Sequence, residues 1–134
     1  MALLSVVIAG LVACNKTIVG EGPLVAENRP ISSFTGIDLQ MDAEVYYQPG
    51  NNLSLEVTGQ QNILDNMQTI VVDDKLVIQY LQVKTFSAGE ITRINITAPD
   101  VNSFSLHSAG DIYCLSPIQT TSLLLRNNGS GTIS

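Results

Sequence analysis

The chain has 134 residues, of which 45% are hydrophobic and only 13% are charged. This length provides for one hydrophobic core but is short for two domains. Twelve acidic residues against six basic ones give a formal net charge of -6, and no cluster of Lys or Arg reverses it locally. Such a surface repels phosphate backbones and excludes nucleic acid as a partner.

The N-terminus carries an uncharged apolar run, residues 1–13, followed by Cys14. As a helix this run would span roughly 20 Å, short of the roughly 30 Å core of a membrane, so we interpret it as a signal peptide. The stretch Leu11-Val12-Ala13-Cys14 resembles the lipobox of bacterial lipoproteins. That resemblance implies an acylated Cys14 at the start of the mature chain, anchored stably by two or three acyl chains. The alternative is a buried N-terminal strand with Cys14 as a small core residue.

The lipobox has one departure, because no basic residue precedes Cys14; a missing upstream start would account for it. Asn15 rather than Asp follows Cys14, which favours the outer membrane over retention at the inner membrane. An acylated Cys14 leaves Cys114 without an intramolecular disulfide partner. We interpret residues 14–30 as a lipidated tether that leads into an edge strand at residues 24–27.

The rest of the chain, residues 31–134, is predicted as one domain of short strands. Residues 37–41 alternate apolar and polar side chains, which is the period of a half-buried strand. Residues 45–48 and 53–57 flank a turn of Pro49-Gly50-Asn51-Asn52, which predicts a hairpin.

A second hairpin is predicted for residues 69–80, where β-branched residues flank the acidic turn Asp73-Asp74-Lys75. Residues 62–67 have the spacing of one helical turn, with Asn62 as its cap. We expect a polar loop over residues 81–90 and a strand over residues 93–98.

Two segments near the C-terminus repeat each other. Residues 102–112 and 123–133 superpose at an offset of 21 residues, with Phe104 on Leu125 and Ile112 on Ile133. Strand–corner–strand units of this period are typical of a β-solenoid. We therefore predict an all-β fold, a parallel β-helix or β-solenoid-like stack of short strands with β-hairpins in its N-terminal half. The chain stops inside the second unit with an apolar face and an edge uncovered, so we expect a C-terminal truncation.

An ordered set of stretches resembles the head GIN domain family of auto-transporter adhesins, common in Bacteroidetes envelope proteins. The stretches are residues 34–39, 44–50, 53–57, 62–64, 76–78, 96–99, 108–112 and 129–131. The resemblance covers about residues 27–134, so the incomplete domain is assigned to residues 31–134. It implies a β-helix-like fold, an exported location and no established enzymatic activity. Ala109, Asn127 and Thr132 depart from the family's pattern and put the packing of the second unit in doubt.

His107 is the only histidine, and it lies beside Ser108 and near Asp111, as in a nucleophilic site. Adjacent residues of a strand point to opposite faces, so His107 is not placed to activate Ser108, and we interpret it as a surface residue. One histidine and one unmodified thiol do not make a zinc site. The sequence therefore predicts no catalytic, metal or cofactor-binding residue, and no cofactor.

Two further kinds of site have candidate residues in the sequence. Asp73-Asp74 with Asp42 or Asp65 would offer oxygens to calcium, but an acidic pair in a hairpin turn is usually solvated. Polysaccharide lyases of β-helix fold need a basic residue beside a carboxylate cluster, and neither Arg93 nor Arg126 follows a run of acids.

Aromatic side chains are the candidates for stacking on glycans, and alternation along strands directs about half of them into the core. They are Tyr46, Tyr47, Tyr80, Phe86 and Tyr113. Cys114 shares the parity of Ile112, so we interpret it as a small buried hydrophobe.

These observations predict a non-enzymatic lipoprotein of the cell envelope, held to the outer membrane by acyl chains on Cys14 and exposed at the cell surface. It would act as an adhesin that presents a polar face to a glycan or a protein. One alternative is a periplasmic structural or envelope-stress module. Another is a β-helix carbohydrate-active enzyme.

Overall fold

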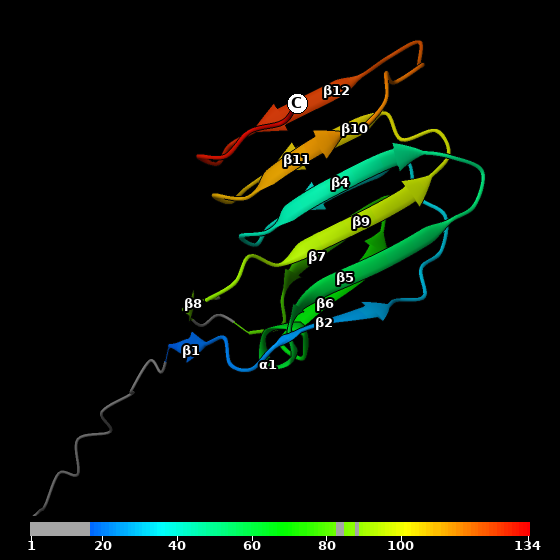
Figure 1. The fold of residues 1–134 in the computed structure, drawn as a ribbon. Helices are drawn as coiled ribbons and strands as arrows, with labels where there is room; N and C mark the ends of the chain where they lie inside the picture. Colours follow the sequence, from blue (N-terminus) through cyan, green and yellow to red (C-terminus); the bar gives the residue numbers. More distant parts are fainter. Residues whose placement is uncertain (1–16, 83–84, 88) are drawn as a thin grey trace, which may run out of the picture.

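The computed structural model describes residues 17–82, 85–87 and 89–134. The predicted signal peptide and Cys14 lie outside these residues. Over the described residues the chain is all-β, as predicted, apart from the single turn α1 (Gln61–Leu64). No helix in this part is long and apolar enough to cross a membrane. Two five-stranded sheets face each other, and a two-stranded sheet lies at one end (Figure 1).

The first sheet has the strand order β12-β10-β3-β7-β6. All neighbouring pairs run parallel except β6 with β7, which are antiparallel. Its strands are β3 (Gly36–Leu39), β6 (Met67–Val72), β7 (Lys75–Tyr80), β10 (Ser103–Leu106) and β12 (Leu124–Asn127).

The second sheet has the order β11-β4-β9-β5-β2. β11, β4 and β9 pair in parallel, whereas β5 is antiparallel to both β9 and β2. Its strands are β2 (Leu24–Asn28), β4 (Glu44–Pro49), β5 (Ser54–Gln60), β9 (Arg93–Ala98) and β11 (Asp111–Cys114). Both sheets are mixed, so the parallel β-helix stays a prediction. The edge strand expected at residues 24–27 is β2.

Three units of chain, β3–β4, β10–β11 and β12 with Ile133, stack in register across the two sheets. In each unit a strand of the first sheet is followed by a corner and then by residues that pair in the second sheet, as in β3 and β4. In the first sheet Phe104 pairs with Ile37 on one side and with Leu125 on the other. In the second sheet Ile112 pairs with Val45 and, through an isolated parallel bridge, with Ile133. The offset of 21 residues read from the sequence is thus the register between the last two units, β10–β11 and β12 with Ile133.

The corners stack as closely as the strands. A Cβ on Gly110 would stand 2.8 Å from the backbone nitrogen of Ala43 and closer still to its carbonyl oxygen. The Asp111 amide donates to that same oxygen at 2.9 Å. Glycine is required here because one backbone approaches another.

Of the two predicted hairpins, only one is correct. β6 and β7 pair around Asp73 and Asp74, whose φ angles of 51° and 62° are left-handed, as a two-residue hairpin turn requires. β4 and β5 follow each other in the chain but do not pair, because β9 lies between them and bonds to both. The hairpin predicted for residues 45–57 is therefore wrong, since turn residues do not reveal a strand inserted from elsewhere.

The N-terminal segment is more structured than the predicted tether. β1 (Ile18–Val19) pairs in parallel with β8 (Phe86–Ser87), which lies in the predicted loop. Asn62 does not cap α1, where Gln60 is the capping residue. The side-chain amide of Asn62 instead donates to the Val19 carbonyl at 2.7 Å, and its Oδ1 atom accepts from the Glu21 backbone amide at 2.9 Å. A side chain that bonds the backbone of a distant strand leaves no local sequence pattern.

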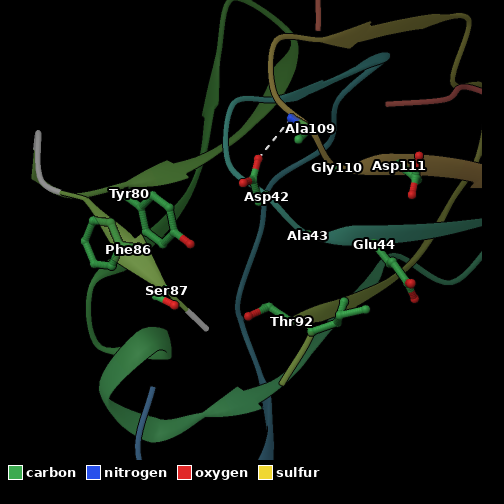
Figure 2. Close-up of a pocket in the computed structure, with 11 residues that line it drawn as sticks. Asp42, Ala43, Glu44, Tyr80, Phe86, Ser87, Thr92, Ala109, Gly110 and Asp111 are labelled. Carbon is green, nitrogen blue, oxygen red and sulfur yellow. Dashed lines mark hydrogen bonds between the residues drawn. The ribbon is translucent and has the colours of Figure 1, made fainter. Parts of the chain in front are cut away.

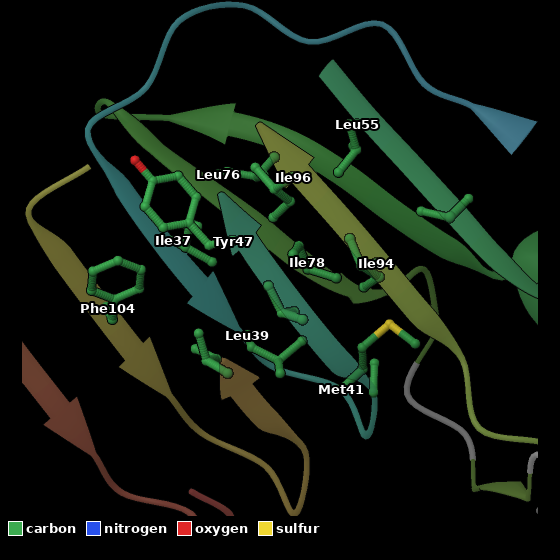
Figure 3. Packing of buried hydrophobic residues seen from close by; sticks show 14 of the residues in the cluster. Ile37, Leu39, Met41, Tyr47, Leu55, Leu76, Ile78, Ile94, Ile96 and Phe104 are labelled. Carbon is green, nitrogen blue, oxygen red and sulfur yellow. The ribbon is translucent and has the colours of Figure 1, made fainter. Parts of the chain in front are cut away.

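The core lies between the two five-stranded sheets (Figure 3). Alternate residues of the inner strands fill it, among them Leu39, Val45, Ile78 and Ile94, all with no exposed surface. Tyr47 and Phe104 contribute the aromatic part, with ring centroids 5.7 Å apart. This core fixes the corners, and the corners position the surfaces described next.

Candidate functional site

A hollow of about 310 Å³ lies at the end of the two sheets where the corners stack (Figure 2). Five segments meet there: the corner before β4, the end of β7, β8, the start of β9 and the corner before β11. The lining residues are Asp42, Ala43, Glu44, Tyr80, Phe86, Ser87, Ile91, Thr92, Ala109, Gly110 and Asp111. We call this space the corner hollow.

One wall of the corner hollow is aromatic. The rings of Tyr80 and Phe86 stack with centroids 3.7 Å apart and planes inclined by 10°. Figure 2 shows the Tyr80 hydroxyl pointing toward the side on which Asp42 lies. Burial raises the pKa of Tyr80, and the negative charge of Asp42 raises it further, so the phenol is neutral at physiological pH.

Polar groups face this wall. The Oδ1 atom of Asp42 accepts a hydrogen bond from the Ala109 amide at 2.9 Å, which fixes the carboxylate against the next corner. Thr92 is 1% exposed, and among the described residues no group forms a hydrogen bond with its Oγ1 atom. In Figure 2 this hydroxyl points toward Ser87. An unsatisfied buried hydroxyl is uncommon in folded proteins.

A second aromatic surface lies on the outer face of the second sheet, and we call it the tyrosine platform. Tyr46 and Tyr113 stand side by side on β4 and β11, with ring centroids 5.1 Å apart and planes inclined by 23°. The Tyr46 hydroxyl donates to Glu44 Oε2 at 2.7 Å, and Arg93 Nε lies 3.4 Å from the same oxygen. This hydrogen bond to Glu44 raises the pKa of Tyr46, whereas burial is the larger cause for Tyr113, followed by the charge of Asp111.

The third surface is apolar. A hollow of about 470 Å³ lies beside β12, lined by Phe104, Cys114, Leu115, Ser116, Pro117, Ile118, Leu123, Leu125, Ile133 and Ser134. Cys114 is partly buried there and packs against the core, and burial raises the pKa of its thiol.

The structure separates His107, Ser108 and Asp111. The His107 imidazole is exposed and its Nε2 lies 3.4 Å from Asp38 Oδ1. Ser108 Oγ donates to the Met41 carbonyl at 2.9 Å, and Asp111 Oδ1 accepts from the Thr132 amide at 2.8 Å. Each side chain therefore has its own partner in a corner or a strand.

The candidate residues for calcium binding and lyase chemistry are also dispersed. Within residues 17–82, 85–87 and 89–134, no three His, Cys, Asp or Glu side chains lie close enough together to hold a metal ion. Arg93 belongs to β9 of the second sheet and Arg126 to β12 of the first sheet.

Of the five aromatic candidates, Tyr47 alone is fully buried, and its hydroxyl donates to the Ala98 carbonyl at 2.8 Å. The other four form the two stacked pairs. Sequence reasoning missed Thr92 and Asp42 as neighbours of an aromatic wall, because β7, β8 and β9 meet only through the topology of the sheets.

The polar Asn127, which departs from the family's pattern, has hydrogen-bond partners in the last corner. Its side chain donates to the Gly131 carbonyl and accepts from the Gly129 amide, and so holds this corner.

Comparison with known proteins identifies one family. The family described as "Putative auto-transporter adhesin, head GIN domain" matches residues 33–134. No curated protein matches the chain.

Crystal structures with a similar fold come from Bacteroides and Parabacteroides. A "putative adhesin" of Bacteroides fragilis is 24% identical, with a TM-score of 0.80 over 87% of this chain and 55% of that one. A "putative lipid binding protein" of Parabacteroides distasonis is 19% identical, with a TM-score of 0.78 over 88% and 51%. A "putative adhesin" of Parabacteroides merdae is 14% identical, with a TM-score of 0.74 over 83% and 46%. The chain thus spans about half the length of these proteins.

Proposed function

Since this chain belongs to the head GIN domain family of auto-transporter adhesins, we propose that it is a non-enzymatic binding module of the cell envelope. Its partner is a glycan or a protein of the cell's surroundings. The fold is shared with proteins of Bacteroides fragilis and Parabacteroides merdae that are described as putative adhesins, which supports an envelope or surface location.

The observation that carries this proposal is the tyrosine platform. Parallel pairing in register fixes Tyr46 and Tyr113 side by side, with Glu44 and Asp111 in the adjacent row of the same face. Aromatic rings next to polar groups are enriched at binding surfaces, because they supply contact area at a low cost in conformational entropy. Strands bonded on both sides hold this surface rigid, so little order is lost when a ligand binds.

The anchor belongs to the proposal as well. Acyl chains on Cys14 would hold the protein to the outer membrane, as the lipobox implies. β1 begins at Ile18, and Asn62 clamps the backbone of Val19 and Glu21 onto the domain. The first ordered strand would then lie only a few residues from the membrane surface. The rest of the domain would extend from that end.

We also propose that the stacked units belong to a β-solenoid. Three units pair in parallel through both sheets, and the last one presents β12 as an open edge. Further units of the same period would extend both sheets without a change of register.

The first test is protease shaving of intact cells that express the full-length gene. A periplasmic marker reports lysis, and Cys14→Ala serves as the unanchored control. We expect digestion of the wild-type protein while the marker survives, and release of Cys14→Ala from the membrane fraction. If the wild-type protein is protected until the cells are lysed, the adhesin proposal is wrong and the alternative of a periplasmic module takes its place.

The tyrosine platform is tested by adhesion of the same cells to immobilised glycans and matrix proteins. Tyr46→Ala with Tyr113→Ala should abolish adhesion, because both stacking rings are lost. The matched control is Ile70→Ala with Val72→Ala, which changes two exposed side chains of β6 in the other sheet and leaves the platform intact. Equal adhesion by the double variant and the wild type would show that this face is not the binding surface.

The apolar hollow beside β12 favours a second candidate, the binding of a lipid. It is supported by the lining of Phe104, Leu115 and Ile118, and by the description of the similar protein of Parabacteroides distasonis. Titration with a fluorescent fatty acid tests it. Leu125→Glu should abolish binding, and Arg126→Glu, at the next position of β12, should not.

A further inference from the structure

The corner hollow has a chemistry that the tyrosine platform lacks, because the buried Thr92 hydroxyl and the exposed Asp42 carboxylate face an aromatic wall inside a concave space. We propose that it binds one sugar unit, either uncharged or carrying an ammonium group, and rejects sugars that carry a carboxylate. This inference rests on the proposed binding function. The proposed function rests on the tyrosine platform, whereas this inference assigns a ligand class to the corner hollow.

The size and the wall of the hollow fit one ring. Its volume of about 310 Å³ lies at the lower end of the roughly 300–1,000 Å³ of small-molecule sites. The stacked Tyr80 and Phe86 offer an aromatic surface, and the 56% exposed Ile91 adds an aliphatic one. A pyranose ring has an apolar face of C–H groups that packs on such surfaces and a periphery of hydroxyls that needs polar partners.

Thr92 supplies the first polar partner. Its backbone carbonyl already accepts from the Glu44 amide at 2.9 Å, so the strand geometry holds the residue in place. Its hydroxyl is buried without a partner among the described residues, and Figure 2 shows it directed toward Ser87 at the wall of the hollow. A ligand therefore reaches this oxygen through a small movement of the side chains around it. A buried hydroxyl without a hydrogen bond is unfavourable, and a ligand hydroxyl satisfies it, because hydroxyls both donate and accept.

Asp42 supplies the second partner and the charge preference. The Ala109 amide occupies one site on Oδ1, and a carboxylate has further acceptor sites for hydroxyl or ammonium donors. Glu44 and Asp111 also border the hollow, although Figure 2 shows their carboxylates pointing away from the aromatic wall. Arg93, beside Glu44, offsets part of this charge. The field therefore attracts an ammonium group and repels a carboxylate.

The test uses three hexoses that share one ring and differ in charge: glucosamine, glucose and glucuronate. Each is titrated into the full chain, purified in mild detergent, and followed by the NMR shifts of the Thr92 and Ile91 methyl groups. We expect affinity to fall from glucosamine to glucose to glucuronate, with about a tenfold difference between the ends of the series. Equal affinities, or tightest binding of glucuronate, would overturn the proposal.

Three variants assign the effect to the hollow. Thr92→Val keeps the shape and removes the hydroxyl, so it should weaken binding of glucosamine and glucose alike while raising Tm. Asp42→Asn keeps an acceptor for the Ala109 amide and removes the charge, so glucosamine should lose its advantage over glucose. The control is Asp73→Asn, the same change of charge in the β6–β7 turn, where Asn tolerates the φ of 51°. It should leave the order unchanged.

Failure here and failure of the proposed function can be told apart. In one outcome the protein is digested on intact cells but binds no sugar, or binds sugar equally well after Thr92→Val. This outcome refutes sugar binding in the corner hollow and leaves the adhesin proposal standing. Sugar binding in the expected order by a protein that is protected on intact cells supports the hollow and refutes the adhesin. If Thr92 is satisfied by water alone, Thr92→Val changes no affinity, and the proposal fails.

Discussion

The units β10–β11 and β12–Ile133 have nearly the same sequence pattern but different burial. Phe104, Leu106 and Ile112 have no exposed surface, whereas Leu124 and Leu125 are 46% and 53% exposed. β10 lies between β3 and β12, while β12 bonds to β10 alone and forms the edge of its sheet. The same apolar spacing therefore specifies where a strand lies, and the neighbours on both sides decide whether its side chains are buried.

The largest expected effect is at the centre of the stack. Phe104→Ala removes a fully buried ring that packs on Tyr47, and it should lower the free energy of unfolding by about 3–5 kcal/mol. Urea denaturation measures it. A loss below about 1 kcal/mol would mean that the centre of the stack is no more tightly packed than its edge.

The next effect tests the corners. Gly110→Ala places a methyl group against the backbone of Ala43, and neither chain is free to move because the Asp111 amide bonds to the Ala43 carbonyl. We expect a loss of about 1–3 kcal/mol in the same assay. Ala109→Ser, one residue earlier on an exposed position, is the control and should be neutral. Equal stability of both variants would contradict the close stacking of the corners.

A smaller effect concerns the buried tyrosine. Tyr47→Phe removes the hydrogen bond to the Ala98 carbonyl, which keeps a second donor in the Gly50 amide, so the loss should be about 1 kcal/mol at neutral pH.

The pH dependence of this variant has a definite sign. Burial raises the pKa of Tyr47 above its ordinary value of 10.0, so the folded state holds this proton more tightly than the unfolded state. The resulting stability is fully present below pH 10 and is lost as pH rises through the folded pKa. Between neutral pH and pH 11 the wild type should lose more stability than Tyr47→Phe. Parallel pH profiles of the two proteins would contradict this.

The smallest effect is at the edge. Leu125→Ala changes a residue in register with Phe104, yet its side chain is about half exposed, so the loss should stay below about 0.5 kcal/mol. The pair of alanine variants measures how much the second neighbouring strand contributes to burial. A loss at Leu125 as large as that at Phe104 would show that β12 is covered in solution.

Sequence reasoning found the strands wherever alternation and turn chemistry coincide. Residues 37–41, 69–80 and 93–98 correspond to β3, β6 with β7, and β9. It failed where pairing partners are distant, as in the insertion of β9 between β4 and β5, and it overlooked β1 and β8, which are two residues each. For the candidate site it identified the aromatic residues and not their partners, because no spacing in the chain places Thr92 opposite Tyr80.

The sequence by itself determined the all-β class, the family and the register of the repeated units, since alternation of side chains and a fixed offset are local properties of the chain. The tertiary structure alone decided which strands are neighbours, which repeats are buried and where Asp42, Thr92 and the Tyr80–Phe86 pair meet. The physical reason is that hydrogen bonds between strands and the exclusion of water depend on segments far apart in the chain. A one-dimensional pattern does not specify which of these segments come together.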